Sequence, residues 1–188
     1  MKTFICLLRG INVSGHNIIK MDALRGMYEA LAFKNVQTYI QSGNVIFKSD
    51  QTDCSQIENK ISKKLLQEFS IQVPVMVKEL AELKAVAKNS PFANKRKEDP
   101  KSLHVTFLSN EPDKGAISAL KGGVYTPDEF ILSGKTVYLF CPEGYGNTKL
   151  TNTFFEKKLK VVATTRNWKT VHELINIAQR ITDGSSQK

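Results

Sequence analysis

The sequence predicts an α+β protein of two ferredoxin-like βαββαβ repeats, with trailing helices and mainly antiparallel sheets. Three observations predict this fold: strand and helix patterns follow the same order in both halves, two hairpin signals align, and one strand–helix junction recurs at a constant offset. The chain of 188 residues is 41% hydrophobic, which is enough to form a core.

The first half opens with an apolar strand at Thr3–Leu8, followed by a polar loop with two glycines at Arg9–Asn17. Apolar residues then recur at helical spacing from Met21 to Leu31. Ser42-Gly43-Asn44 predicts a hairpin turn, and Ser55 with Glu58 predicts a capping box at the start of a second helix. The remaining expected elements are strands at Val36–Gln41, Val45–Lys48 and Val73–Lys78, and a helix at Glu79–Lys88.

The second half repeats this order. Leu103, Val105 and Phe107 alternate with polar residues, as in a half-buried strand. Pro112 is expected to open a short helix that Gly122-Gly123 closes. The other expected elements are a hairpin of Phe130–Leu132 and Thr136–Phe140 around Ser133-Gly134, a helix with a capping box of Thr153 and Glu156, a strand at Val161–Thr165, and a helix from Asn167 to about Ile181.

The two halves also align residue by residue. Tyr39–Gly43 matches Phe130–Gly134, and Lys78 and Leu80 match Arg166 and Trp168. We therefore expect a duplication, with a first repeat at residues 1–88, a polar and basic linker at 89–101, and a second repeat at 102–188.

Charge and cysteine usage limit the function classes. The net charge of +9 favours polyanions at low salt, so weak nonspecific nucleic-acid binding is expected. No apolar stretch has the length of a membrane helix, so we expect no membrane association. Cys6, Cys54 and Cys141 have no paired spacing, which predicts no disulfide, no metal, no cofactor and a reducing, cytoplasmic location.

Four segments together resemble one protein family. They are Leu7-Leu8-Arg9-Gly10-Ile11-Asn12-Val13, Thr38-Tyr39-Ile40-Gln41-Ser42-Gly43-Asn44-Val45, Pro142-Glu143-Gly144-Tyr145-Gly146-Asn147-Thr148-Lys149-Leu150 and Thr165-Arg166-Asn167-Trp168-Lys169-Thr170-Val171. This set resembles the domain-of-unknown-function family 1697, found mainly in bacteria, over nearly the whole chain.

The resemblance implies a fold of two ferredoxin-like repeats, in agreement with the pattern above, and it implies no reaction. The sequence departs from the family pattern at Ser14, Cys141 and Thr148, where glycine, histidine and serine are common. The missing histidine weakens any case for acid–base chemistry at position 141.

The loop Arg9–Asn17 is the strongest candidate for a binding site. Arg9 offers a bidentate fork for phosphate or carboxylate, Gly10 and Gly15 let backbone amides approach an anion, and Asn12 is a neighbouring donor. We expect the second repeat to make the same connection with Ser109–Glu111 alone. The alternative is that Arg9 pairs with an internal carboxylate and that the glycines only form turns.

Three further candidates lie in the second repeat. Gly144–Lys149 could form an anion-binding loop with Lys149 as its charge, and Arg166 lies beside a helix that Asn167 is expected to cap. From the ferredoxin-like topology we expect Gly144–Lys149 and Arg166 to lie at opposite ends of their sheet. His16, His104 and His172 are expected to be surface or structural residues.

Three functions stay open at this point. The first is an anion-binding module for a phosphorylated small molecule or a nucleic acid. The second is an enzyme that acts on a small phosphorylated or carboxylated substrate between the repeats. The third is a structural or interaction protein. The sequence identifies neither the ligand nor the oligomeric state.

Overall fold

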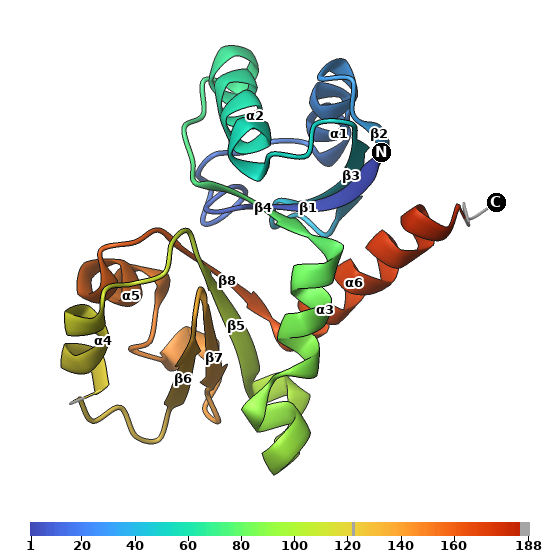
Figure 1. The fold of residues 1–188 in the computed structure, drawn as a ribbon. Coiled ribbons are helices and arrows are strands. Elements are labelled where there is room, and N and C mark those ends of the chain that lie inside the picture. The colour runs from blue at the N-terminus through green and yellow to red at the C-terminus, as the bar shows by residue number, and fades with distance from the viewer. Residues whose placement is uncertain (122, 185–188) are drawn as a thin grey trace. The chain divides into compact units, whose positions relative to one another are not determined.

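The computed structural model describes residues 1–121 and 123–184 (Figure 1). Its contacts divide the chain into two compact units, one of residues 1–84 with the segment from Glu173, the other of residues 85–172. Each unit contains the βαββαβ core of one repeat, and the boundaries between the units fall within the helices that follow the two cores. Across the described residues, no helix combines the length and apolarity needed to cross a bilayer.

The first unit is a four-stranded antiparallel sheet in the order β2-β3-β1-β4. Helices α1 and α2 cover one of its faces (Figure 1), and Phe4, Cys6 and Leu8 of the central strand belong to the core that the helices share with the sheet. The elements are β1 (Lys2–Leu8), α1 (Met21–Ala30), β2 (Lys34–Tyr39), β3 (Asn44–Ser49), α2 (Cys54–Phe69), β4 (Val75–Glu79) and the trailing α3 (Leu80–Lys88).

The second unit has the same topology, in the order β6-β7-β5-β8. Its elements are β5 (Leu103–Leu108), α4 (Lys114–Lys121), β6 (Glu129–Ser133), β7 (Thr136–Phe140), α5 (Asn152–Leu159) and β8 (Ala163–Asn167). The trailing α6 (Trp168–Asp183) follows β8, and its residues from Glu173 belong to the first unit. The predicted α+β class and the repeated βαββαβ order are confirmed. Gly122 of the predicted closing glycine pair lies outside the described residues.

Matching backbone hydrogen bonds show how closely the repeats correspond. At the end of β1, the amide of Leu8 donates to Gly43 (2.8 Å) and the amide of Arg9 donates to Pro74 (3.1 Å). At the end of β5, the amide of Leu108 donates to Lys135 and that of Ser109 to Val162, both at 2.9 Å. In each repeat these bonds tie the central strand to the hairpin on one side and to the last strand on the other.

Both predicted capping boxes are wrong. Asp53 caps α2, because its carboxylate accepts from the backbone amides of Ser55 (2.8 Å) and Gln56 (3.2 Å). Glu58 instead accepts from the amide of Val77 (2.7 Å), which joins the helix to β4. The second repeat departs in the same way, with Thr151 as the cap of α5 and Glu156 bound to the amide of Ala163.

Residues 89–101 were expected to be a linker. Most of them are ordered, with a short π-helix at Pro91–Arg96 and a 3-10 helix at Pro100–Ser102. Phe92 is buried and packs against Phe140 with the two rings tilted and their centroids 6.0 Å apart. Arg96 lies over both rings and donates to the two carboxylate oxygens of Glu129 (2.7 and 3.0 Å). This segment is therefore part of the second unit.

Gly43 is the glycine whose replacement tests the packing at the end of β1. A Cβ there would lie 2.7 Å from Cβ of Leu8 and 3.0 Å from Cδ1 of Ile11, at a φ of +75°. We expect Gly43→Ala to lower the free energy of unfolding by about 2–4 kcal/mol, from overpacking and backbone strain together. Urea unfolding measures this loss.

The matched control is Gly15→Ala, where φ is +78° and a Cβ would meet no atom within 4 Å. This substitution should lower the free energy of unfolding by only about 1–2 kcal/mol, from backbone strain alone. Equal losses in the two variants would contradict the packing argument.

Candidate functional site

The long loop between β1 and α1 is an ordered miniature hairpin. The amide of His16 donates to Val13 (2.9 Å), and the amide of Asn12 donates to Asn17 (3.1 Å). Ser14 and Gly15 at the tip both have left-handed φ angles, of 49° and 78°. This turn geometry favours glycine at the second position and fits the notably polar sequence.

Asn12 holds this loop in place. Its Nδ2 donates to the carbonyls of Ile19 (3.0 Å) and Gln41 (3.1 Å), and its Oδ1 accepts from the amide of Ile19 (2.8 Å). Both side-chain hydrogens are therefore used within the repeat, so Asn12 acts as a positioning residue in this conformation. Ile11 and Ile19 are buried in the core, which gives the loop a structural role that the sequence did not reveal.

The counterpart connection in the second repeat is Ser109–Asp113, longer than the expected Ser109–Glu111. It contains two acidic residues, Glu111 and Asp113, and Asp113 caps α4 by accepting from the amide of Ala116 (2.9 Å). The two repeats therefore differ in the charge of this connection as well as in its length.

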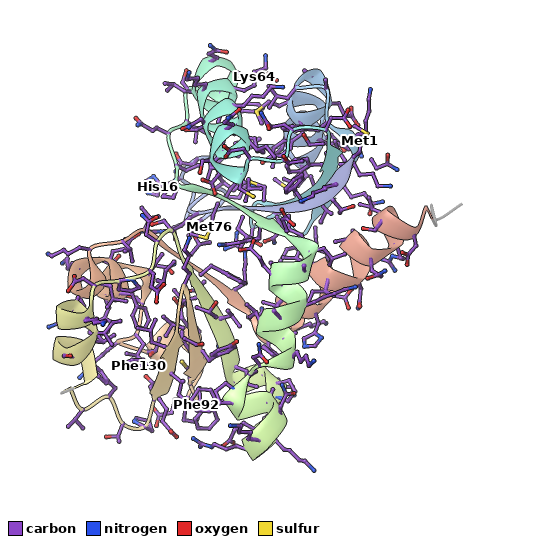
Figure 2. The ribbon with its side chains drawn as sticks, in the orientation of Figure 1. Met1, His16, Lys64, Met76, Phe92 and Phe130 are labelled. Atoms are coloured by element: carbon purple, nitrogen blue, oxygen red, sulfur yellow. The ribbon has the colours of Figure 1, made fainter. Side chains whose placement is uncertain are left out.

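Three loops share one end of the first sheet, and none of them contains an acidic residue. They are residues 9–20, 40–43 and 70–74, and their basic side chains are Arg9, His16 and Lys20. Acidic side chains gather at the opposite end instead, where Asp50 and Glu79 lie. Figure 2 shows His16 and Met1 at these two opposite ends. The loop end therefore has a positive potential.

Backbone groups at this end are also open to a ligand. A Cβ at Gly10 or Gly15 would meet no atom within 4 Å. Helix α1 begins after Lys20 with no side-chain cap, so its first amides lack that partner. Asp22 in the first helical turn is paired with Arg25 (3.2 Å). Arg9 itself is partly buried at the end of β1.

The same end exposes aliphatic side chains. Val13, Ile18 and Ile40 are 54%, 64% and 51% exposed. No Phe, Tyr or Trp occurs in the three loops. A ligand at this end would therefore meet aliphatic surface and positive charge, without an aromatic ring for stacking.

In the second repeat, the expected separation of Gly144–Lys149 and Arg166 is wrong. Leu103 at the start of β5 pairs with Phe140 at the end of β7, and His104 pairs with Asn167 at the end of β8. The loop after β7 and the end of β8 therefore lie at the same end of the sheet. The error arose because β5 and β7 are antiparallel, so the segments that follow them leave from opposite ends.

The candidate residues at this end do not form one cationic site. Exposed Lys149 lines a cavity of about 210 Å³ together with the carboxylates of Asp128 and Glu143. Arg166 is buried and donates from Nη1 to the carbonyl of Thr165 (2.9 Å). Asn167 caps α6, as expected, by accepting from the amide of Thr170 (2.7 Å).

The second repeat contains a polar cluster that was not predicted from the sequence. The hydroxyls of Thr106 and Thr165 lie 2.7 Å apart, and Thr165 donates to Oδ1 of Asn152 (2.7 Å). Beside them the rings of His104 and Tyr145 stack at 4.8 Å. Matching positions in the first repeat hold apolar Phe4, Cys6 and Val77, so an alignment of the two central strands would have found it.

Burial sets the protonation of several side chains. It lowers the pKa of the His104 imidazole, and it raises the pKa of the Cys141 thiol to about 11. Burial also raises the pKa of Cys54. Both thiols therefore stay protonated at neutral pH. In residues 1–121 and 123–184, no group of three His, Cys, Asp or Glu side chains could hold a metal ion, and no disulfide forms.

Comparison with known proteins identifies relatives of this fold. A family model described as "Protein of unknown function (DUF1697)" matches residues 1–138. Among solved structures, the conserved bacterial protein SP0830 from Streptococcus pneumoniae is similar with a TM-score of 0.75 and 22% identity, covering 94% of this chain and 98% of that one. At this identity the similarity concerns the fold. No curated protein matches.

The depressed pKa of His104 predicts a dependence of stability on pH. The unfolded chain takes up a proton near pH 6.5, before the folded protein does, so stability is lost as the pH falls below 6.5. We expect His104→Phe, which installs the residue of the first repeat, to reduce this loss. Melting temperatures of both proteins between pH 7.5 and pH 5.5 measure it.

The control is His16→Gln, which removes an exposed histidine. If His104→Phe kept the full loss of stability at low pH, or if His16→Gln removed it, the assignment to His104 would be wrong.

Proposed function

The chain belongs to the DUF1697 family, described as proteins of unknown function, and we propose that it is an anion-binding module whose site is the acid-free loop end of the first repeat. Arg9 supplies the main charge, Gly10 and Gly15 give access to backbone amides, and Asn12 keeps the loop in shape. We also propose a cytoplasmic location, where Cys6, Cys54 and Cys141 stay reduced.

One observation carries the proposal: the three loops at this end, residues 9–20, 40–43 and 70–74, carry Arg9, His16 and Lys20 and contain no Asp or Glu. No carboxylate from these loops competes with an external anion for this end of the sheet. The N-terminus of α1 has no side-chain cap, so its first backbone amides are further hydrogen-bond donors, and the helix dipole favours an anion there.

The surroundings favour a small organic anion over a nucleic acid. Single-stranded nucleic acids are bound largely through stacking on aromatic side chains, and these loops have none. Exposed Val13, Ile18 and Ile40 suit an apolar portion of the ligand. We therefore propose a phosphorylated or carboxylated small molecule with an aliphatic part, alongside weak nonspecific binding of nucleic acids through the net charge.

The chemistry at this end supports binding more than catalysis. The loops offer one imidazole, His16, and neither a carboxyl nor a thiol group to share a proton transfer with it. In the second repeat, Lys149 lies beside two carboxylates, Arg166 is buried, and Asn167 caps a helix. The proposed site is therefore limited to the first repeat.

The test is a thermal-shift screen of nucleotides, phosphosugars, organic acids and short RNA, followed by titration of the best ligand. A ligand that binds only the folded state raises the melting temperature in proportion to occupancy. We expect Arg9→Ala to weaken binding roughly tenfold to a hundredfold, because a charged hydrogen bond contributes about 1.5–3 kcal/mol.

The matched control is Arg25→Ala, which removes a partly exposed arginine of the same repeat that is paired with Asp22. It should leave the affinity within about twofold, since the lost charge already has an acidic partner. A folded Arg9→Ala protein with unchanged affinity would end the proposal. So would a screen in which short RNA alone binds and Arg9→Ala has no effect.

A further inference from the structure

Strand β6 forms an open edge of the second sheet. In the order β6-β7-β5-β8 it is the outermost strand, and among residues 1–121 and 123–184 it pairs only with β7. The hairpin closes with Ser133 opposite Thr136, across a two-residue turn. Because hydrogen-bonded and non-bonded pairs alternate from that point, the backbone N–H and C=O groups of Phe130 and Leu132 point away from β7.

This edge lacks several of the features that normally prevent strand addition. Its sequence, Glu-Phe-Ile-Leu-Ser, contains neither proline nor lysine, and its register with β7 is unbroken. The corresponding edge strand of the first repeat, β2, starts with Lys34 and has a register shift between Lys34 and Gln37. Asn35 within that shift has a left-handed φ of 52°. One repeat therefore protects its edge and the other does not.

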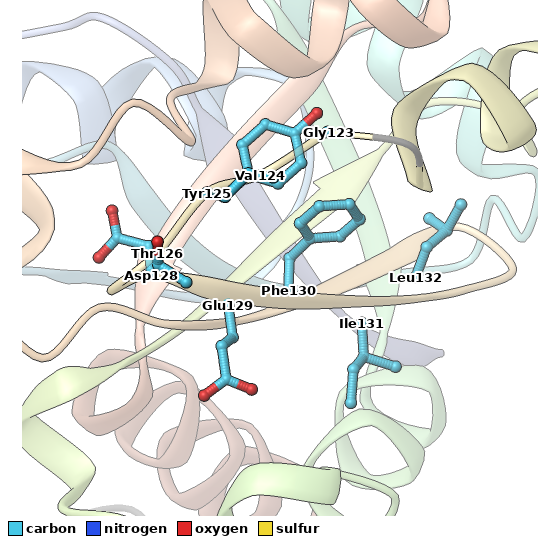
Figure 3. Close-up of a pocket in the computed structure, with 9 residues that line it drawn as sticks. All are labelled: Gly123, Val124, Tyr125, Thr126, Asp128, Glu129, Phe130, Ile131 and Leu132. Atoms are coloured by element: carbon cyan, nitrogen blue, oxygen red, sulfur yellow. The ribbon is translucent and has the colours of Figure 1, made fainter.

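A groove runs beside this edge, with a volume of about 510 Å³. Figure 3 shows the side chains of Tyr125, Phe130 and Leu132 on one side of β6, with Glu129 and Ile131 pointing to the other. The segment before the strand forms the opposite wall, where the ring of Tyr125 meets that of Phe130 edge-on at 5.4 Å. Val124 is 87% exposed and Ile131 42% exposed.

The charge of the groove is opposite to that of the chain. Among the described residues that line it, the charged ones are Asp128 and Glu129, in a protein with a net charge of +9. Glu129 is paired with Arg96. Asp128 accepts a hydrogen bond from the hydroxyl of Thr148 (2.6 Å) and also lines the neighbouring cavity that contains Lys149. The described residues that line the groove itself include carboxylates and no cation, so the groove favours a peptide with a basic residue.

From these observations we propose that β6 binds an extended peptide segment of another protein as an additional strand. The peptide backbone pairs with Phe130 and Leu132, its alternate apolar side chains lie in the groove, and a lysine or arginine lies near Asp128. An extended backbone is the occupant because it alone matches a row of outward N–H and C=O groups at strand spacing.

The test begins with a phage-displayed library of random ten-residue peptides selected on the whole protein. We expect enriched peptides to alternate apolar residues and to carry a basic residue at one end. A synthetic copy of the enriched peptide is then N-methylated at alternate residues, in two complementary sets. One set should lose two hydrogen bonds and bind about tenfold to thirtyfold more weakly, and the other should bind as before.

Two protein variants test the location. Val124→Lys and Ile131→Lys place a cation on the groove and on the edge strand, and each should weaken binding at least tenfold, by repelling the basic peptide and by protecting the edge. Leu66→Lys, at an exposed apolar residue of α2, is the matched control and should leave binding unchanged.

Three results would overturn the proposal. The first is the absence of any enriched peptide. The second is equal binding of both N-methylated sets, which would mean that the backbone does not pair with β6. The third is dimerisation of the wild-type protein that Ile131→Lys abolishes, which would assign the edge to a second copy of this chain.

Discussion

The central strand of each repeat depends on being hydrogen-bonded on both sides up to its last residue. Leu8 and Arg9 donate to the hairpin and to the last connection of the first sheet, as Leu108 and Ser109 do in the second. These bonds fix where the chain leaves the sheet. Arg9 therefore begins its loop at a set position beside Pro74, and the residues that follow can diverge between repeats without disturbing the strands. The loop that carries the candidate site therefore differs between the two repeats, while the strands on either side of it keep the same arrangement.

The buried side chains of the two repeats differ, although the strands have the same arrangement. Phe4 and Cys6 of the first central strand pack among apolar side chains, whereas His104 and Thr106 of the second form part of a polar cluster with Thr165. A buried hydroxyl costs free energy unless it is hydrogen-bonded, and here Thr165 bonds both Thr106 and Asn152. The interior of the second repeat is therefore less purely apolar, and the lowered pKa of His104 predicts that it loses stability in acid.

The sequence predicted the local features well, since apolar periodicity depends on neighbours a few residues apart. It failed where the answer depended on distant partners. Ser55 and Glu58 have capping-box spacing, but Asp53 was a better placed cap and Glu58 was used by Val77. The bonds of Asn12 to Ile19 and Gln41 likewise join residues that only folding brings together, so its positioning role could not be found in the loop sequence. Arg9 was identified by its chemistry, whereas the sheet topology was needed to show that three loops without Asp or Glu meet at this end.

On the two proposals above, the duplicated fold uses a different surface for recognition in each repeat. In the first repeat the edge strand β2 is blocked by its register shift, and the distinctive surface is the acid-free loop end. In the second repeat the matching loop carries Glu111 and Asp113, so an anion is repelled there, while the edge of β6 stays open beside an acidic groove. Because each feature is absent from the other repeat, neither is required by the βαββαβ fold itself. Features that the scaffold does not need, and that cost solubility or stability when left exposed, are the ones best explained by a bound partner.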